Sequence, residues 1–357
     1  MKIIIFALSG IGDALMFTPS IRLLRNTYPD ATIDAMVMFR GVKDIYERNK
    51  FLNNVYYYDF MKEGAVKSLL YLLKFRNKYD ASFNVYPSNR KEYNIFSFIV
   101  GAKRRAAVNY LRMNSRNLAF LNNVTVTEND SLHNVEENIL LCEKITGQKF
   151  SERPPLDFFF TGEDLRFAED YLKEQNIADS DIVIGFHPGS ATLKNHIHRR
   201  WEPEKFSELG KKLIEDLGAK VLIFGGPEEA ELKKRVTEGI ASPNAISVEA
   251  GNLAASAAVM KRCNLFISND SSLMHVASAL QLKVVAIIGP TNPNYIHPWQ
   301  TGHKIVTLNL ECSPCFFYSP RPLICYRTDV KFKCIKELTV DMVYSAANGF
   351  MGQIIKK

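Results

Sequence analysis

The run Asn-Asp-Ser-Ser at positions 269–272, followed by His275, has the residue types and spacing needed to bind a phosphate group. An apolar run at 265–268 precedes it and a helix-like pattern follows, which predicts a strand that delivers a polar turn to a helix N-terminus. Free backbone N–H groups and a partial positive charge at such a terminus favour an anion. His275 would lie about one turn into the helix, on a face that looks back at the turn. The alternative is an ordinary N-cap with a histidine in the core.

A second polar turn, Ser-Gly-Ile-Gly-Asp at positions 9–13, follows the apolar N-terminal segment. Gly10 and Gly12 permit a tight turn and let a ligand approach the backbone closely. The turn lacks the third glycine of a dinucleotide-binding fingerprint and the Lys-Ser/Thr of a P-loop, and Asp13 would repel a pyrophosphate. A carboxylate here is suited to act as a general base toward a sugar hydroxyl. The alternative for Asp13 is an acidic residue that only complements the helix dipole.

A third turn, His-Pro-Gly-Ser-Ala-Thr at 187–192, follows the predicted strand 182–186 and leads into the basic stretch 194–200. Small hydroxyl residues and free N–H groups at a strand end can cradle a diphosphate, and an arginine can stabilise it as a leaving group. The candidate side chains for these roles are Ser190, Thr192, Lys194, Arg199 and Arg200. The alternative is a solvated basic loop.

Two further turns with glycine also come directly after predicted strands. In Gly-Gly-Pro-Glu-Glu at 225–229, Glu229 could hold the ribose or base of a nucleoside, or it could simply belong to an acidic first helical turn. In Gly-Pro-Thr-Asn-Pro at 289–293, Thr291 could contact a phosphate or a sugar, or the segment could be only a turn.

Alternating strand and helix patterns position these turns. The predicted strands cover 2–8, 32–38, 55–58, 81–85, 182–186, 220–224, 265–268 and 283–288. The predicted helices cover 13–26, 64–79, 94–100, 136–146, 164–175, 203–217, 228–239, 253–262, the segment after 271, and 339–355. This order predicts parallel sheets that are covered by helices on both faces.

The alternation breaks at 147–161, where Gly147 can end a helix and Arg-Pro-Pro at 153–155 cannot continue one. A chain of 357 residues forms two domains by default. We therefore predict an α/β fold with an N-terminal domain over 1–155, a C-terminal domain over 156–338 and a final helix over 339–357. Two doubly wound, Rossmann-like domains that face each other would leave a cleft at the carboxyl ends of their strands, where ligands of such sheets bind.

The composition is that of a soluble globular protein, with 46% hydrophobic and 23% charged residues. A net charge of +7 suits an anionic partner such as a nucleotide, a phosphorylated glycolipid or a membrane surface. No dense Lys/Arg stripe alternates with aromatic residues, so nucleic acid is not an expected partner. The apolar N-terminal run has no cleavage site, and no segment has the length of a membrane-spanning helix. We expect a cytoplasmic protein with peripheral contact to the inner membrane.

Six cysteines are unevenly distributed along the chain. Cys142 and Cys263 fall in helical patterns and are expected to be buried. The other four cluster near the C-terminus: Cys312, Cys315, Cys325 and Cys334. A Cys-x-x-Cys pair with two more cysteines nearby leaves two interpretations open, a structural zinc or iron site or free thiols that only pack.

In order and spacing, the motifs together resemble glycosyltransferase family 9, the family of ADP-heptose:lipopolysaccharide heptosyltransferases. The resemblance runs from position 1 to about 338 and includes Arg-Arg-Trp-x-Pro-x-x-Phe at 199–206 and Asn-Asp-Ser-Ser-x-x-His-x-Ala at 269–277. It implies the two-domain GT-B fold, with acceptor sugar bound by the first domain and nucleotide-sugar donor by the second. It matches Asp13 to the catalytic base, 190–192 to the donor-phosphate turn and Glu229 to the nucleoside contact. Donor-binding roles fall on Asp270, Ser271, Ser272 and His275. Arg199 falls where the family most often has a lysine. Two departures from the family pattern are the loop 193–198, which is longer than the compact family form and leaves open whether Lys194 or Arg199 is the matching position, and Ser272, where the family often has glycine.

The resemblance implies an inverting transfer of heptose from ADP-heptose to an inner-core sugar of lipopolysaccharide, a lipid-linked oligosaccharide, with no cofactor needed. Asp13 would deprotonate the acceptor hydroxyl, and Arg199 would stabilise the departing diphosphate. Three alternatives stay open: a transferase for another nucleotide sugar, an epimerase, and a non-catalytic sugar-nucleotide binder. The missing third glycine disfavours a dehydrogenase.

Overall fold

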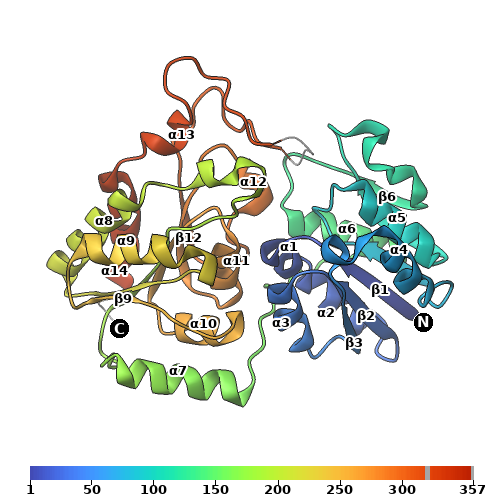
Figure 1. Ribbon diagram of the computed structural model, residues 1–357, viewed down its shortest axis with the longest axis horizontal. Coiled ribbons are helices and arrows are strands. Elements are labelled where there is room, and N and C mark those ends of the chain that lie inside the picture. Colours follow the sequence, from blue (N-terminus) through green and yellow to red (C-terminus); the bar gives the residue numbers. More distant parts are fainter. Residues whose placement is uncertain (318–321, 355–357) are drawn as a thin grey trace. The chain divides into compact units, whose positions relative to one another are not determined.

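The computed structural model describes residues 1–317 and 322–354, which divide into two compact α/β units (Figure 1). Unit 1 is Met1–Phe159, and unit 2 comprises Phe160–Phe317 and the described residues from 322 onward. Each unit is built on its own six-stranded sheet, in which neighbouring strands pair in parallel. The predicted α/β fold class is therefore confirmed. Over the described ranges, the helices are too short or too polar to span a bilayer.

Unit 1 has the strand order β3-β2-β1-β4-β5-β6, the doubly wound arrangement in which a ligand binds where the chain reverses direction beside β1. Its strands are β1 (Lys2–Ala7), β2 (Thr32–Val37), β3 (Asn54–Tyr57), β4 (Ala81–Asn84), β5 (Arg104–Asn109) and β6 (Val124–Thr127). Its helices are α1 (Ile11–Met16), α2 (Thr18–Thr27), α3 (Arg40–Glu47), α4 (Phe60–Leu73), α5 (Lys91–Val100) and α6 (Asn134–Thr146).

The structure corrects several predicted elements of unit 1. Helix α3 (Arg40–Glu47) was not predicted, and the helix predicted over 64–79 is α4, which begins at Phe60 and ends at Leu73. The single helix predicted over 13–26 is divided into α1 and α2 at Phe17, with Pro19 in the first turn of α2, where its missing N–H costs no hydrogen bond. The sequence pattern predicts no strand between 100 and 136, whereas β5 and β6 lie there. Both strands carry exposed polar residues, so neither shows the apolar run of a central parallel strand.

Unit 2 has the order β12-β11-β10-β7-β8-β9, which is the same winding with β7 in the place of β1. Its strands are β7 (Val183–His187), β8 (Lys220–Ile223), β9 (Ala245–Ser247), β10 (Leu265–Asn269), β11 (Lys283–Ile287) and β12 (His303–Val306). Its helices are α7 (Gly162–Glu174), α8 (Pro203–Leu217), α9 (Ala230–Ile240), α10 (Leu253–Met260), α11 (Ser272–Ala279), α12 (Pro293–Ile296), α13 (Lys333–Lys336) and α14 (Val340–Ile354). Ile355, the predicted end of the last helix, lies outside the described residues.

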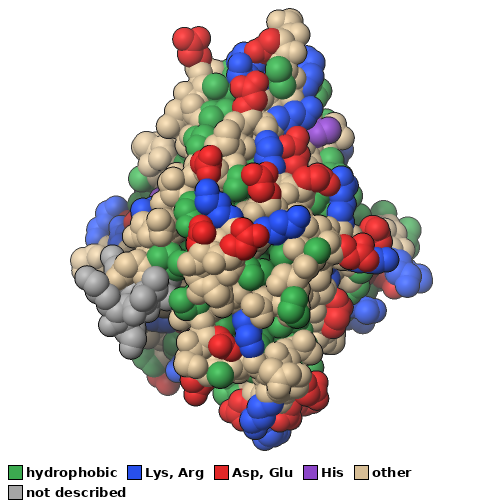
Figure 2. Space-filling model, turned by 90° about the vertical axis from the view of Figure 1, so that its left-hand side faces the viewer, with side chains coloured by type: hydrophobic (Ala, Val, Ile, Leu, Met, Phe, Trp, Pro, Cys, Tyr) green, Lys and Arg blue, Asp and Glu red, His purple; other side chains and the backbone are tan. Residues whose placement is uncertain are grey.

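The core of unit 2 fixes the carboxyl ends of its strands. Alternate residues of β7, β8, β10 and β11 pack with α8, α9 and α14 around the fully buried Trp201. The indole N–H of Trp201 donates to the carbonyl of Leu338, and its backbone N–H donates to the Asn269 side chain at the end of β10. On the outer face shown in Figure 2, side chains of both charge signs are interspersed.

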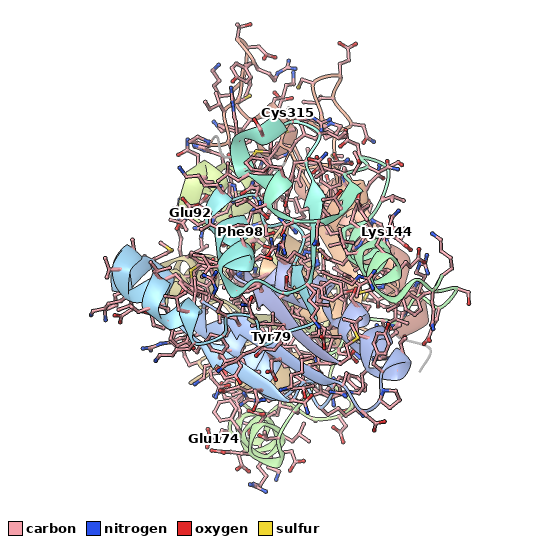
Figure 3. The ribbon with its side chains drawn as sticks, turned by 90° about the vertical axis from the view of Figure 1, so that its right-hand side faces the viewer. Tyr79, Glu92, Phe98, Lys144, Glu174 and Cys315 are labelled. Atoms are coloured by element: carbon pink, nitrogen blue, oxygen red, sulfur yellow. The ribbon has the colours of Figure 1, made fainter. Side chains whose placement is uncertain are left out.

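An aromatic cluster supports α4 in unit 1. The ring of Tyr71 stacks on that of Tyr58 with centroids 4.0 Å apart, and the Phe60 ring packs against Phe96 at 4.4 Å. Leu72 is fully buried beneath the helix. The light-blue α4 in Figure 3 lies at the margin of unit 1, so only one of its faces has protein to pack against.

Candidate functional site

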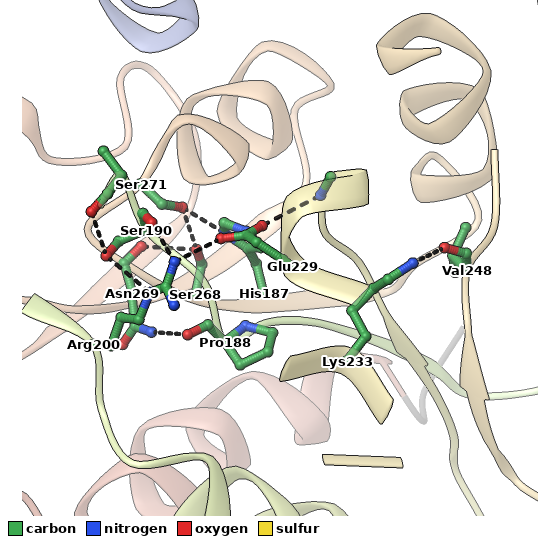
Figure 4. A network of polar contacts seen from close by, with 12 residues as sticks. His187, Pro188, Ser190, Arg200, Glu229, Lys233, Val248, Ser268, Asn269 and Ser271 are labelled. Carbon is green, nitrogen blue, oxygen red and sulfur yellow. Dashed lines mark hydrogen bonds and ion pairs between the residues drawn. The ribbon is translucent and has the colours of Figure 1, made fainter. Parts of the chain in front are cut away.

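Four turns of unit 2 that the sequence singled out meet at one edge of its sheet. They follow β7, β8, β10 and β11, and parallel strands bring their carboxyl ends to the same side. β7 and β10 are neighbours at the point where the winding reverses, which is the usual ligand position in this architecture. Figure 4 shows that side chains from three of these turns are connected by hydrogen bonds and ion pairs.

Ser271 precedes α11 but does not cap it. Its hydroxyl lies 2.7 Å from Nδ1 of His187 and 3.1 Å from the hydroxyl of Ser268, and no side-chain cap is made to the helix. The first-turn N–H groups of α11, which begins at Ser272, are therefore not occupied by a capping oxygen. These N–H groups are therefore able to donate hydrogen bonds to an anion, as the sequence predicts for this helix terminus.

Glu229 is held in place by two basic side chains. Its Oε2 lies 2.9 Å from Nε2 of His187, and its Oε1 accepts from Nη2 of Arg200 at 3.2 Å. Burial raises the pKa of Glu229, but the hydrogen bond and charge of His187 and the charge of Arg200 outweigh it, so the pKa lies below its ordinary value. Glu229 is thus an oriented carboxylate at neutral pH.

Gly189 allows Glu229 to approach the turn after β7. A Cβ at position 189 would lie 1.8 Å from Oε1 of Glu229, so any side chain there would displace this carboxylate. The guanidinium of Arg200 closes the same turn, since its Nη2 donates to the carbonyl of Ser190 at 2.6 Å and its Nε to the Ser190 hydroxyl at 3.3 Å.

Asp270 joins three of the turns. Its Oδ2 accepts from Nη1 of Arg199 at 2.7 Å and from the hydroxyl of Thr291 at 2.6 Å. Nε of Arg199 and Nδ1 of His275 are buried and have no hydrogen-bond partner within the described ranges. Burial lowers the pKa of His275 to about 4, although the charge of Asp270 opposes this, so its ring is neutral at pH 7. Buried polar atoms without partners cost about 1–3 kcal/mol each, a cost that a polar ligand here would remove.

Thr192 and Lys194, the remaining candidate residues of unit 2, lie outside this network of buried contacts. Thr192 is exposed and Lys194 is half-buried, and both belong to the segment around the 3-10 helix η3 (Leu193–Arg199), which contains no buried residue. The backbone carbonyl of Lys194 accepts from the N–H of Leu323. A direct donor contact by Thr192 or Lys194 stays a prediction.

Sequence reasoning did not assign roles to His187 and Asn269, yet both connect the turns. His187 bridges Glu229 and Ser271, and the Asn269 side chain donates to the carbonyl of Pro188 at 2.8 Å. The available signal was their position, because each is a polar residue at the last position of a fully buried strand.

In unit 1, Asp13 lies at the edge of the sheet where its winding reverses. It stands in the first turn of α1, directly after β1, and its Oδ2 accepts from the N–H of Gly10 at 3.1 Å. Burial, together with the charge of Asp13, raises the pKa of both Tyr46 and Tyr93. Neighbouring Gly12 is buried, whereas Gly10 is exposed. Asp13 itself is half-buried and makes a capping contact, and both interpretations of this residue stay compatible with its position.

The cysteines differ from their predicted settings. Cys142 is buried in α6, but Cys263 is buried in the turn before β10 and not in a helix. The four clustered cysteines are free thiols, as one of the two interpretations has it, but Cys312 and Cys315 are exposed, whereas Cys334 is buried. Across 1–317 and 322–354, no group of three or more His, Cys, Asp or Glu is arranged to hold a metal ion, so the zinc or iron alternative gains no support.

The model of "Glycosyltransferase family 9 (heptosyltransferase)" matches residues 93–321, more than half of the chain. The chain belongs to glycosyltransferase family 9. A 30% identical stretch of 183 residues is shared with lipooligosaccharide heptosyltransferase 2 of Campylobacter jejuni. It covers 48% of this chain and 53% of that relative, so the match spans about half the relative's length.

Solved structures confirm the fold of this family member. A glycosyl transferase family 9 structure from Veillonella parvula superposes with a TM-score of 0.78 at 24% identity, covering 99% of this chain and 97% of that one. The Escherichia coli ADP-heptose lps heptosyltransferase II superposes with a TM-score of 0.73 at 20% identity, covering 99% of both chains. The predicted GT-B fold class is thereby confirmed.

Proposed function

We propose that the chain is an inverting glycosyltransferase that moves heptose from ADP-heptose to an inner-core sugar of lipopolysaccharide. Membership of glycosyltransferase family 9 supports this, as do the names of the Campylobacter and E. coli proteins it resembles. The acceptor would be a lipid-linked oligosaccharide at the inner membrane, which a cytoplasmic enzyme reaches from the membrane surface. The transfer would require no metal or organic cofactor.

The observation that carries the proposal is the convergence of the strand-end turns of unit 2 on Asp270 and Glu229. The N–H groups at the start of α11 would bind the diphosphate, and Arg199 would neutralise its charge. Glu229, oriented by His187 and Arg200, would accept hydrogen bonds from the ribose hydroxyls of the nucleoside. Neutral His275 would offer its unpaired Nδ1 to the sugar or the phosphate.

Asp13 would supply the base. As its carboxylate takes the proton of the acceptor hydroxyl, the oxygen attacks the anomeric carbon and the bond from that carbon to the diphosphate oxygen breaks. ADP leaves with the bonding electron pair, and a single displacement of this kind inverts the anomeric centre. Arg199 and the dipole of α11 would stabilise the charge that develops on the diphosphate.

A panel of nucleotide sugars tests the proposal against its alternatives. The purified protein is incubated with ADP-heptose, UDP- and GDP-sugars, with and without a heptose-deficient core oligosaccharide, and the products are identified by mass spectrometry. We expect a product of one added heptose only with ADP-heptose and acceptor together. Conversion of a donor without acceptor would indicate an epimerase. Tight donor binding without any product would indicate a non-catalytic binder, and either result contradicts the proposal.

A further inference from the structure

The solvent-facing side of α4 in unit 1 is apolar. Val66, Leu69, Leu70 and Leu73 are 73%, 44%, 59% and 39% exposed, respectively. Their spacing of three, four and seven residues places them on one face of the helix. The opposite face, which includes the buried Leu72, packs on the aromatic cluster of unit 1. The second half of α4 is therefore apolar on both faces, unlike an ordinary surface helix.

This apolar face is fixed outward. The stacking of Tyr71 on Tyr58 anchors the inner side of α4, so the helix cannot rotate to bury its outer leucines without breaking that packing. Gly64, with a φ of 77°, interrupts α4 and separates its first turn from the rest of the helix. In that first turn the side chain of Met61 is 60% exposed and adds to the apolar surface. Figure 3 shows α4 at the margin of unit 1.

Basic side chains surround the apolar face. The exposed basic residues of α4 and the segment that follows it are Lys62, Lys67, Lys74, Arg76 and Lys78. Lys67 pairs with Glu63 at 3.2 Å, and Lys74 lies 5.5 Å from the centre of the Tyr71 ring. The side chains of Lys62, Arg76 and Lys78 form no ion pair within the part of the chain that the structure describes. This contrasts with the mixed charges on the face of unit 2 in Figure 2.

We propose that α4 docks unit 1 onto an anionic lipid bilayer, with its outer leucines and Val66 inserted between the headgroups and the basic residues on lipid phosphates. Apolar side chains rimmed by lysine and arginine are what an interfacial helix presents to such a surface. A second copy of the chain fits less well, because its own basic residues around α4 would be repelled by those of the first copy. The inference rests on the proposed function in one respect: the proposed acceptor is lipid-linked and therefore lies at an anionic membrane surface.

Vesicle co-sedimentation tests the docking without any sugar substrate. We expect the protein to bind vesicles of phosphatidylglycerol and phosphatidylethanolamine, to release as salt rises, and to bind phosphatidylcholine vesicles weakly. The double variant Val66→Asp/Leu70→Asp should lower the partition coefficient by at least about tenfold. The matched control is Leu165→Asp on α7, where the leucine is 39% exposed, and it should bind as the unaltered protein does. Melting curves verify that each variant folds.

The charge contribution has its own variants. Lys74→Gln and Lys78→Gln should each weaken binding about fivefold, because each basic residue near an anionic surface contributes about 1 kcal/mol. The exposed Lys234 of α9 gives the control, Lys234→Gln, which should have no effect.

Two results would overturn the docking. One is that the protein does not bind anionic vesicles, or that the α4 variants bind them as well as the unaltered protein does. The other is a lipid-free dimer in sedimentation analysis that the Val66→Asp/Leu70→Asp variant converts to a monomer. Transfer to a soluble, delipidated acceptor is measured in parallel. Transfer without vesicle binding removes the docking alone, whereas vesicle binding without transfer removes the proposed function and leaves the docking supported.

Discussion

Arg199 and Asp270 form a buried ion pair, with Nη1 of the arginine 2.7 Å from Oδ2 of the aspartate and side-chain exposures of 12% and 6%. The same carboxylate oxygen accepts from Thr291, so one atom connects the turns after β10 and β11 with the end of η3. Nε of Arg199 is buried without a partner among the described residues. A diphosphate at the start of α11 would meet this guanidinium already oriented, which is the condition for stabilising a leaving group at little reorganisation cost.

Replacing Arg199 tests this arrangement. In the Arg199→Ala variant we expect kcat for heptose transfer to fall by about 100-fold, because one oriented donor to the developing charge is lost. Arg199→Lys should retain more activity, since it keeps a positive charge without the planar fork. The control is Arg235→Ala, which removes a largely exposed arginine paired with Glu204. Steady-state kinetics with full activity in Arg199→Ala would exclude the residue from the mechanism.

The position of Glu229 depends on a glycine. Gly189→Ala should reduce the affinity for ADP by at least about tenfold, because its Cβ would lie 1.8 Å from Oε1 of Glu229 and displace the carboxylate. Gly251→Ala is the matched control in unit 2, where an added Cβ meets nothing within 4 Å. Isothermal titration with ADP measures both variants. Equal ADP affinity for the two would show that Glu229 does not contact the nucleotide.

His275 predicts a pH dependence of stability. Burial lowers its pKa from 6.5 to about 4 in the folded chain. Between these two pH values His275 binds a proton in the unfolded chain but not in the folded chain. The contribution of neutral His275 to the free energy of unfolding is therefore complete above pH 6.5 and is lost as the pH falls toward 4. At pH 5 the free energy of unfolding is lower by about 2 kcal/mol because of this residue.

Urea unfolding at pH 7 and pH 5 measures this contribution. The decrease in the free energy of unfolding between the two pH values should be smaller by about 2 kcal/mol in His275→Gln. His196, whose pKa burial also lowers to about 4, remains in both proteins and cancels in the comparison. The exposed His198 supplies the control variant His198→Gln. The same pH-dependent loss with and without His275 would contradict the account.

The sequence was informative where local chemistry and sheet geometry agree. Asp270, Glu229 and Thr291 each follow a strand pattern, and parallel pairing alone brings such turns to one edge. The links between the turns could not be predicted, because they join residues far apart in the chain. His187 and Glu229 are separated by 42 positions, and their contact depends on the absence of a side chain at Gly189.

Two other features that the sequence did not predict, strand β5 and the conformation of η3, also have physical explanations. β5 begins with two arginines and ends with the exposed Asn109, so only the three residues 106–108 are buried and apolar, too short a run to predict a strand. The backbone of η3 is left-handed at Lys194 and Asn195, a conformation that local sequence does not specify, so the positions of Thr192 and Lys194 could not be predicted.

The most direct measurement of the central claim is a parallel assay of Asp13→Asn for transfer rate and for ADP-heptose affinity. We predict that kcat falls by at least about 100-fold, the usual contribution of a general base, while the donor Kd stays within about twofold because the asparagine oxygen can still accept from Gly10. Asp30→Asn, at an exposed aspartate of unit 1, is the control and should change neither quantity. Unchanged turnover of Asp13→Asn, with inverted product still formed, would contradict the account.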